Sequence, residues 1–409
     1  MAMRKIVVGV SGGIAAYKAC MLVREFKERG DDVRVVPTPN ALNFVGAATF
    51  EALSGNPVST EVFDAVDEVQ HVRVGQEADA IVIAPATADL MARLVAGRAD
   101  DLLTATVLVA TCPVIVAPAM HTEMWNNPAT QANVATLRER GVVVLEPAHG
   151  RLTGKDTGAG RMLEPAQIAE LSRAVLDGAD FTHDWKGKKV VVSAGGTQEN
   201  IDPVRFIGNR SSGKQGFALA DVAAHRGADV TIVAGDTDEL DTPAGATIIR
   251  VRSTRDMEQA MNDVAKDADV VIMAAAVSDF RPAAEADSKL KKGSEDEDAL
   301  STVHLVENPD ILAGLVDKRE RGELKDGMRI VGFAAETGDA SSTGLEYGRA
   351  KLERKGCDYL MVNEVTGGKV FGEPTNRGWL LGADGSEVTI PDGSKHLVAA
   401  SILAKIDLK

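Results

Sequence analysis

The sequence predicts an α/β protein made of two three-layer domains, each a mostly parallel sheet flanked by helices. Its 409 residues exceed one ordinary domain of about 100 to 200 residues. Two segments, 4–13 and 188–197, begin alike, with basic residues followed by a β-branched run and a turn of small residues. Apolar runs without alternation are typical of strands buried on both faces, as in a parallel sheet covered by helices. Each segment therefore predicts the first strand of an α/β domain.

The first domain is predicted to span residues 1–180. After its first strand, further strands are expected at 79–84, 113–117 and 142–145, and helices are expected at 17–29 and 164–176. Strands that alternate with helices in this way form βαβ units with right-handed crossovers. A polar, glycine-bearing stretch at 177–187 marks the predicted boundary with the next domain.

The second domain is predicted to span residues 186–409 and to repeat the βαβ pattern. Its later strands are expected at 229–234, 269–275, 329–334 and 358–362. Near the end of the chain, Asp384-Gly385 separates two apolar segments, 377–381 and 387–390, which predicts a hairpin. Residues 285–308 are charged and lose periodicity, so we expect a mobile excursion outside the core, of the kind that forms lids.

Charge and composition exclude several classes of protein. With 45 Lys and Arg against 60 Asp and Glu, the formal net charge is −15, and no basic stripe spans the sequence, which argues against a nucleic-acid partner. Cys20, Cys112 and Cys357 lie far apart, which is neither a disulfide framework nor a zinc spacing, so we expect a reducing cytoplasm. The first apolar run is too short for a signal peptide and no 18-residue apolar stretch is present, so we expect a soluble protein with no membrane partner.

Two glycine-bearing turns suggest phosphate ligands. Residues 11–18, Ser-Gly-Gly-Ile-Ala-Ala-Tyr-Lys, let the backbone approach a phosphate while the following helix supplies N–H groups. Their glycines lack the G-x-G-x-x-G spacing, so a tight turn without a ligand is equally open. Residues 208–214, Gly-Asn-Arg-Ser-Ser-Gly-Lys, are close to a P-loop, but Gln215 stands where the magnesium-binding Ser or Thr would be. We reject the P-loop and keep a phosphate-binding or structural turn.

Other candidate residues have a plain structural alternative. His71 lies just before a helical stretch, and a lone histidine is more often a packed or surface residue than a catalytic one. Residues 118–125 carry two methionines and a tryptophan, which can pack against a flat ring or cap the core at a subunit interface. Asp279 stands at the carboxyl end of a predicted parallel strand, where ligand sites form, or else it caps a helix.

Lysines indicate an anion site in the second half. Three of them lie within residues 289–292, inside the acidic excursion, where they would attract a triphosphate or simply form a solvated surface. Lys351 and Lys355 lie four apart on one face of a predicted helix and can converge on the same anion.

Taken together, these motifs resemble the bifunctional phosphopantothenoylcysteine decarboxylase/phosphopantothenate–cysteine ligase family of bacterial coenzyme A synthesis. The resemblance covers nearly the whole chain in the right order. It rests on residues 11–18, 71, 84–89, 118–120, 195–197, 201–205, 209–214, 289–292, 308–310 and 332–337. It implies a cytoplasmic enzyme with a flavodoxin-like/Rossmann-like flavoprotein domain that binds FMN and a Rossmann-like ligase domain that uses CTP.

The resemblance implies two successive reactions. The family's ligase joins 4′-phosphopantothenate to L-cysteine through an acyl-cytidylate, and its decarboxylase then makes 4′-phosphopantetheine. A plain α-amido carboxylate has no electron sink, so the family uses FMN to oxidise the thiol carbon first. The resemblance implies that His71 is catalytic, that Met120 and His121 contact the substrate, and that FMN is bound by Ser11, Gly12, Gly13, Thr38 and Thr87.

The first half departs from the family pattern at two places. His121 stands where the family commonly has an asparagine for the substrate carboxylate. Residues 150–162 hold no cysteine, although the family's flexible clamp commonly carries one as the proton donor. Lys155, Asp156, a bound water and the reduced flavin are all open as the donor.

In the ligase half, charge on the α-phosphate must be stabilised, so lysines and Mg²⁺ are expected. The resemblance implies that Lys289 and Asn209 are catalytic and that Asp279 lies near the triphosphate and its metal ion. The implied CTP site comprises Met273, Ala274, Ala275, Asp279, Lys289, Pro309, Asp310, Ile311, Leu312, Phe333, Lys351 and Lys355.

The remaining predictions concern the oligomeric state and two alternative functions. The family's flavoprotein domains form trimers and its ligase domains form dimers, so the resemblance implies a homo-oligomer, with a dodecamer among the arrangements. A flavin-binding regulatory or scaffold subunit with an inactive decarboxylase half is the alternative, which His121 and the missing cysteine permit. A dinucleotide oxidoreductase would require a Rossmann fingerprint that the sequence lacks.

Overall fold

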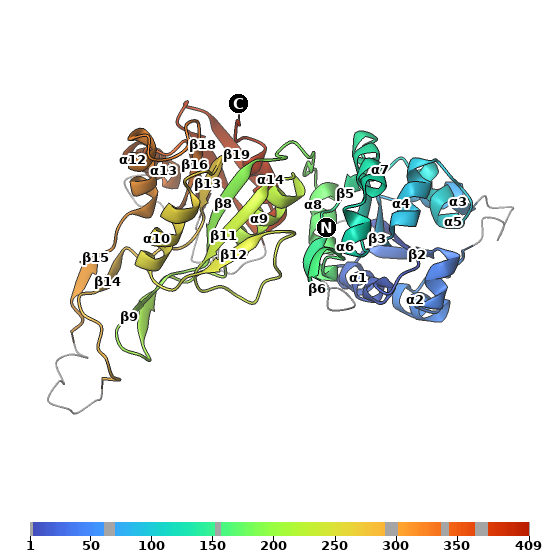
Figure 1. Cartoon of the computed structure of the whole chain (residues 1–409), viewed down its shortest axis with the longest axis horizontal. Coiled ribbons are helices and arrows are strands. Elements are labelled where there is room, and N and C mark those ends of the chain that lie inside the picture. The colour runs from blue at the N-terminus through green and yellow to red at the C-terminus, as the bar shows by residue number, and fades with distance from the viewer. Residues whose placement is uncertain are drawn as a thin grey trace. The chain divides into compact units, whose positions relative to one another are not determined.

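The computed structural model describes residues 3–60, 70–151, 157–290, 302–336, 343–364 and 375–408. The chain divides into two compact units, 1–183 and 184–409, and most of their elements are labelled in Figure 1. Within the described ranges, no helix is long and apolar enough to cross a bilayer. Each unit holds one large sheet.

The sheet of the first unit has five parallel strands in the order β2-β1-β3-β4-β5. They are β1 (Lys5–Val10), β2 (Asp32–Pro37), β3 (Ala80–Ala86), β4 (Val114–Pro118) and β5 (Val143–Val144). The predicted parallel sheet is confirmed, and β3, β4 and β5 match the strands expected from the sequence. β3 is buried along its whole length, as its unbroken apolar run predicts.

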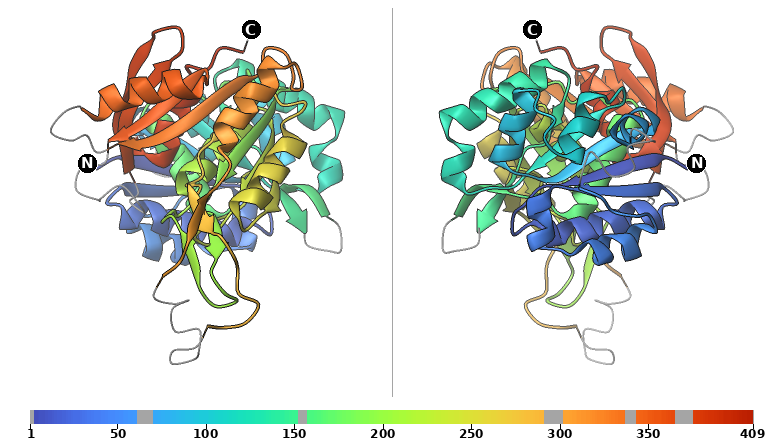
Figure 2. Two further views of the ribbon diagram at one scale, coloured as in Figure 1. Left: turned by 90° about the vertical axis from the view of Figure 1, so that its left-hand side faces the viewer. Right: turned by 90° about the vertical axis from the view of Figure 1, so that its right-hand side faces the viewer.

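Helices cover both faces of this sheet. They are α1 (Ala16–Glu28), the 3-10 helix η1 (Pro39–Asn43), α2 (Ala47–Ser54), α3 (Gln70–Glu77), α4 (Ala88–Val95), α5 (Leu102–Leu108), α6 (Thr122–Trp125), α7 (Pro128–Glu139) and α8 (Pro165–Leu176). α1 packs against α8 and α4 packs against α7, and Figures 1 and 2 show α1 and α7 on opposite sides of the sheet. A separate hairpin, β6 (Ala148–Arg151) and β7 (Thr157–Arg161), precedes α8.

The sheet of the second unit has eight strands in the order β12-β11-β8-β13-β16-β17-β18-β19. They are β8 (Lys189–Ala194), β11 (Asp229–Ala234), β12 (Thr247–Arg250), β13 (Val270–Met273), β16 (Arg329–Glu336), β17 (Tyr359–Glu364), β18 (Thr375–Gly382) and β19 (Glu387–Ser394). The six strands from β12 to β17 are parallel, and β18 and β19 form the predicted antiparallel hairpin. Gly385 in its turn has a φ of 85°, which suits glycine.

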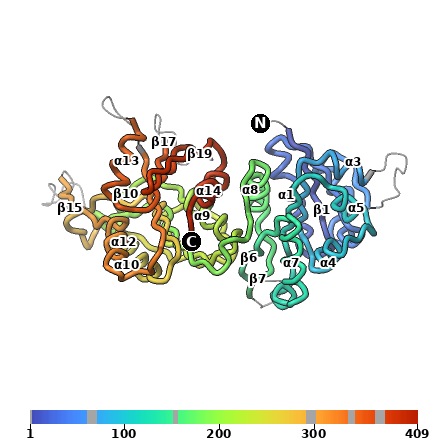
Figure 3. The backbone as a smooth tube through the Cα atoms, turned by 90° about the horizontal axis from the view of Figure 1, so that it is seen from above, coloured from blue at the N-terminus to red at the C-terminus, as the bar shows by residue number. Residues whose placement is uncertain are grey.

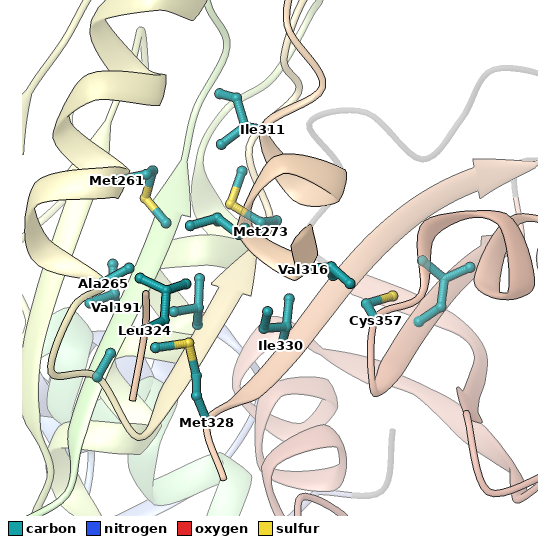
Figure 4. Close-up of a cluster of buried hydrophobic side chains, with 14 of the residues drawn as sticks. Val191, Met261, Ala265, Met273, Ile311, Val316, Leu324, Met328, Ile330 and Cys357 are labelled. Carbon is teal, nitrogen blue, oxygen red and sulfur yellow. The ribbon is translucent and has the colours of Figure 1, made fainter. Parts of the chain in front are cut away.

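The helices of the second unit within the described ranges are α9 (Lys214–His225), α10 (Thr254–Val264), α12 (Ile311–Glu320), α13 (Gly344–Lys355) and α14 (Lys395–Leu403). α9 and α14 pack side by side, as Figure 3 shows. The core cluster in Figure 4 joins Met261 of α10, Met273 of β13 and Ile311 of α12. Burial of these side chains fixes α10 and α12 against the parallel strands.

Two short hairpins extend from the second sheet. The first arm is β9 (Gln198–Asn200) with β10 (Phe206–Gly208), and the second arm is β14 (Phe280–Pro282) with β15 (Leu305–Glu307). β9 and β14 are in contact, and Figure 1 shows both arms reaching away from the sheet. The excursion expected at 285–308 belongs to the second arm. β15 was not expected there, and residues 291–301 lie outside the described part of the chain.

Candidate active sites

The strand order of the first unit places a candidate ligand site between β1 and β3. In a doubly wound sheet of order 2-1-3-4-5, the neighbours of the first strand are reached in opposite directions, and a crevice opens at the carboxyl ends of strands 1 and 3. Residues 11–13 follow β1 and Thr87 follows β3, so both lie at this switch point. The backbone N–H of Thr38 donates to Val10 O at 2.8 Å, which brings the end of β2 to the same edge.

Ser11 joins the two strand ends. Its hydroxyl donates to Pro85 O at 2.8 Å and accepts from the Thr87 N–H at 3.0 Å, and the residue is only 2% exposed. A hydroxyl has a single proton, so Ser11 has none left to donate to a phosphate in this arrangement. Thr87 is also engaged, because its hydroxyl accepts from Leu90 N–H and caps α4. These two residues therefore shape the turn.

The start of α1 supplies the anion-binding groups of this site. α1 begins without a side-chain cap and has no acidic residue in its first turn. The backbone N–H groups of Gly12 and Gly13 have no acceptor among the residues that the structure describes. Uncapped N–H groups and the helix dipole favour a negatively charged group. The residues present therefore fit the phosphate of a flavin mononucleotide.

Gly12→Ala should reduce flavin binding. A Cβ at Gly12 would lie 2.6 Å from the Cβ of Asn40 and 2.9 Å from its carbonyl carbon, so η1 or the turn must shift. Overpacking of this kind costs about 1–3 kcal/mol of folding free energy. The flavin content of the purified variant, read from its visible absorbance per mole of chain, checks the expectation.

Gly46→Ala is the matched control, because a Cβ at Gly46 meets nothing within 4 Å. Wild-type flavin content in both variants would show that the turn at Gly12 does not hold the flavin.

The predicted substrate residues of the first half, Met120 and His121, lie in the loop between β4 and α6. Ala119 N–H donates to Ala86 O at 3.1 Å, which sets Met120 beside the end of β3. Met120 N–H donates to Gly160 O at 2.9 Å in β7, and a Cβ at Gly160 would lie 2.4 Å from Met120 O. His121 is exposed and precedes α6 without a side-chain capping bond. Lys155 and Asp156 lie outside the described residues.

His71 lies in the first turn of α3, not just before the helix as the sequence predicted. The helix already begins at residue 70, so His71 is its second residue. His71 is half-buried, and its Nδ1 atom is buried without a hydrogen-bond partner among the described residues. A buried ring nitrogen without a partner is costly unless a ligand or water supplies one.

The second unit has its switch point between β8 and β13, since its parallel strands follow the order 3-2-1-4-5-6. Gly196 bridges to Asp236 on one side and to Ala276 on the other. Ala275 N–H donates to the hydroxyl of Ser193, the residue before the end of β8, at 3.1 Å. The small residues after β8 and β13 thus form one continuous backbone surface at the carboxyl edge of the sheet.

A buried polar network supports this edge. Thr254, at the start of α10, donates from its N–H and its hydroxyl to Glu199 Oε1, at 2.9 and 2.8 Å. Its hydroxyl also lies 3.1 Å from that of Thr197, which accepts from Ser278 N–H. Asn308 Nδ2 donates to Ser278 O at 2.9 Å. The network ties the first arm, α10 and the base of the second arm to the ends of β8 and β13.

The predicted nucleotide residues follow neighbouring strands of this sheet. Met273 is buried in the core at the end of β13, and Ala274 and Ala275 follow it half-buried. Phe333 of β16 and Pro309 are half-buried. Ile311 and Leu312 open α12.

Asp310 and Lys355 of the predicted CTP set form an ion pair with each other. Asp310 also caps α12 by accepting from Ala313 N–H at 3.1 Å. Burial raises the pKa of Asp310, but the hydrogen bonds from Lys355 and Ala313 outweigh it and hold the pKa below its ordinary value. Lys351 lies one turn earlier on α13. The expectation that Lys351 and Lys355 converge on one anion stays a prediction, and an anion at Lys355 would have to compete with the Asp310 carboxylate.

The last three predicted residues lie on or beside the two arms: Asn209 follows β10, Asp279 precedes β14, and Lys289 lies between β14 and β15. Asn209 is exposed, and its Nδ2 donates to Val277 O at 2.9 Å, just beyond β13. Asp279 is exposed and precedes β14, so its alternative interpretation as a helix cap is wrong. Lys289 is exposed and makes no ion pair with any described residue, while Lys291 and Lys292 lie outside the described range. The described residues contain no cluster of three acidic, histidine or cysteine ligands.

The comparisons with known proteins cover the whole chain. Residues 1–177 match the family described as "Flavoprotein", and residues 185–408 match the "DNA/pantothenate metabolism flavoprotein C-terminal domain". The "Coenzyme A biosynthesis bifunctional protein CoaBC" of Mycolicibacterium smegmatis is 60% identical over 406 residues, which are 99% of this chain and 97% of that protein. The protein of the same name from Vibrio vulnificus is 43% identical over 409 residues, 99% of this chain and 98% of that protein.

The chain belongs to the CoaBC family. A solved structure, "Crystal structure of the C-terminal Domain of Coenzyme A biosynthesis bifunctional protein CoaBC", is 33% identical and covers 55% of this chain and 96% of that chain, with a TM-score of 0.44. As a CoaBC protein, the chain is a bifunctional enzyme of coenzyme A synthesis with a decarboxylase half and a ligase half. The resemblance inferred from the motifs is confirmed, and the flavoprotein match supports the predicted FMN cofactor.

Sequence reasoning on this CoaBC chain missed the supporting polar residues. Glu199 and Thr254 are buried at the ligase edge, but neither stands in a recognisable motif. Asp202 and Asn308 stand in motifs that carried the family resemblance, yet no role followed from their spacing. The sequence signal that could have pointed to Asp202 is that it lies close to the glycine-bearing turn at 208–214.

Proposed function

We propose that this CoaBC protein ligates 4′-phosphopantothenate with L-cysteine, using CTP as co-substrate, and then decarboxylates 4′-phosphopantothenoylcysteine with bound FMN. The observation that carries the proposal is that one chain holds two mostly parallel sheets, each with small-residue turns on both sides of its switch point. Sheets of this class bind ligands in the crevice at such a point.

In the decarboxylase half, FMN supplies the electron sink when it is bound. The uncapped start of α1 suits its phosphate, and Ser11 and Thr87 hold the two strand ends together. We assign His71 to the thiol proton or the substrate carboxylate, because its buried Nδ1 lacks a partner among the described residues. Met120, tied to β7 through its N–H, suits the substrate or the flavin ring, and exposed His121 suits the substrate carboxylate.

In the ligase half, the substrate carboxylate attacks the α-phosphate of CTP, and pyrophosphate leaves. Negative charge on the phosphate oxygens must be stabilised, which suits the ammonium group of Lys289. Asn209 is tied to the backbone beyond β13 and suits the acyl intermediate. Asp279 offers an exposed carboxylate to Mg²⁺, which binds through one or two carboxylates together with substrate phosphates.

Separate measurement of pyrophosphate and CO₂ tests the proposal. The purified protein should be yellow, should release pyrophosphate from CTP and 4′-phosphopantothenate, and should release CO₂ only after cysteine is added. EDTA should stop pyrophosphate release but leave the decarboxylation of supplied 4′-phosphopantothenoylcysteine intact. A colourless protein that ignores CTP would overturn the proposal. A yellow protein that releases pyrophosphate but no CO₂ would favour the scaffold role for the first half.

We also propose a homo-oligomer built through both halves. Large apolar side chains are exposed on each half, which is typical of association surfaces. They include Ile14, Tyr17 and Met21 around α1, and Val204, Phe206, Phe280, Leu305 and Val306 on the two arms. Trimers of the first half and dimers of the second would together give a closed assembly such as a dodecamer. Sedimentation of the purified protein tests this, and a monomer at micromolar concentration would contradict it.

A cytoplasmic location is consistent with the thiols. Cys20, Cys112 and Cys357 are all free. Burial raises the pKa of the Cys357 thiol to about 11, so it stays protonated and unreactive at neutral pH. Three unpaired thiols are typical of a protein that works in a reducing compartment.

A further inference from the structure

The segment that carries Lys289 is docked on the turn of the first arm. Asn200 Nδ2 donates to Glu285 Oε1 at 2.9 Å, and Ala286 N–H donates to Ile201 O at 3.0 Å. The last contact of the segment is made at residue 290, next to Lys289. There the Leu290 N–H donates to Asp202 Oδ2 at 3.2 Å.

The two carboxylate oxygens of Asp202 serve different partners. Oδ1 accepts from the backbone N–H groups of Val204 and Arg205, both at 2.8 Å, and so closes the turn of the first arm. Oδ2 accepts from Arg205 Nη1 at 2.9 Å and from the Leu290 N–H. The same Arg205 Nη1 also donates to Leu290 O at 3.3 Å. Leu290 is therefore held at both its N–H and its carbonyl group.

Asp202 is completely buried, with 0% of the residue exposed. Burial raises the pKa of its carboxyl group, but hydrogen bonds from the N–H groups of Val204, Arg205 and Leu290, together with the Arg205 charge, outweigh it and leave the pKa below its ordinary value. The group is thus an ionised acceptor at neutral pH. A neutral side chain of the same shape cannot accept from all four donors.

We propose that Asp202 is a positioning residue of the ligase, which anchors the chain at Leu290 and thereby fixes the origin of the Lys289 side chain. The inference rests on the proposed role of Lys289. Lys289 is exposed and has a long, flexible side chain, so the position of its backbone decides whether its ammonium group reaches the α-phosphate. A displacement of about 1 Å in a charged group of this kind can cost up to about 100-fold in rate.

Asp202→Asn separates the anchor from the turn. The single amide oxygen can keep the two backbone donors of the turn, for which asparagine is well suited. The NH₂ group then faces the Leu290 N–H and the Arg205 guanidinium, both of which are donors, so the Leu290 N–H loses its acceptor and Leu290 keeps only the 3.3 Å bond from Arg205 Nη1 to its carbonyl group. We expect pyrophosphate release from CTP and 4′-phosphopantothenate to fall at least about tenfold in kcat/KM. Deuterium exchange in residues 285–290 should accelerate.

Two controls distinguish positioning from a general loss of structure. Asp384→Asn makes the same change in another turn, where Asp384 Oδ1 accepts from Ser386 N–H at 2.9 Å, and should leave pyrophosphate release unchanged. The decarboxylase half of the same chain should keep its rate on supplied 4′-phosphopantothenoylcysteine in Asp202→Asn.

If Asp202 acts through Lys289, adding Asp202→Asn to Lys289→Gln should cause no further loss of the residual pyrophosphate release.

The Lys289→Gln and Asp202→Asn variants test the proposed ligase function and the positioning role of Asp202 separately. Full ligase activity in Lys289→Gln would contradict the proposed function. An inactive Lys289→Gln beside a wild-type rate in Asp202→Asn would overturn only the positioning role. A full additional loss in the double variant would also overturn it, because Asp202 would then act independently of Lys289.

Discussion

Lys289→Gln should reduce pyrophosphate release from CTP and 4′-phosphopantothenate by about 100-fold or more, the effect of removing one preorganised charge from a reaction centre. The side chain is exposed and forms no ion pair with the described residues, so its replacement removes no contact that stabilises the fold. Glutamine keeps most of the length of the side chain but cannot carry its charge. Stopped-time assays of pyrophosphate at saturating CTP measure the expected loss.

Lys405→Gln is the matched control, because Lys405 is exposed beyond α14 and the change in net charge is the same. CO₂ release from supplied 4′-phosphopantothenoylcysteine is a second control within the same chain. A wild-type rate of pyrophosphate release in Lys289→Gln would remove Lys289 from the reaction.

The strands that were expected from the sequence could be predicted because each one satisfies a local rule, whereas the six-residue strand β2 was not expected. β11 was expected at 229–234 and spans Asp229–Ala234, since residues 230–233 form an unbroken β-branched run, and α9 and α10 pack against the strand. β12, its neighbour at the edge of the sheet, was missed because its residues are only half-buried or exposed. β10 and β15 were missed for the same reason: they are three-residue strands in exposed arms, and pairing with a partner strand defines them more than their own pattern does.

The positions of the candidate sites could be predicted from the sequence, but the hydrogen-bond and ion-pair partners of their side chains could not. Residues 11–13 follow the first strand of a βαβ unit, and that alone predicts a ligand turn. Nothing local indicates that the Ser11 hydroxyl donates to Pro85, 74 residues away, or that Asp310 pairs with Lys355. Such pairings arise when the strands are laid side by side, so a list of site residues from motifs contains both ligand groups and the groups that hold them.

The two similar segments, 4–13 and 188–197, contain strands that occupy equivalent places in their sheets. β1 and β8 are each the strand from which their sheet is built in both directions, so each is followed by the turn at the switch point. The turns then diverge. Residues 11–16 enter α1 directly, whereas the first arm is inserted between β8 and α9. The inserted arm carries Asp202 in its turn and is followed by Asn209, whose amide donates to Val277 O just beyond β13.

His71→Asn should lower CO₂ release from 4′-phosphopantothenoylcysteine by at least about 100-fold, the contribution of one positioned acid or base. Asparagine is similar in size and can form a hydrogen bond, but it does not exchange a proton near neutral pH. His71 is on α3 and belongs to neither of the turns after β1 and β3 that suit the flavin phosphate. The variant should therefore stay yellow, with a flavin content per chain equal to that of the wild type.

His183→Asn controls for the loss of an imidazole, because His183 lies in the same unit and pairs with Glu146 at 3.2 Å. Its CO₂ release should match the wild type. An undiminished rate in His71→Asn would mean that another group handles the proton, either His121 or a group of the clamp at 150–162. A colourless His71→Asn would instead mean that α3 shapes the flavin site, because loss of the cofactor would then account for the lost activity without any proton transfer by His71.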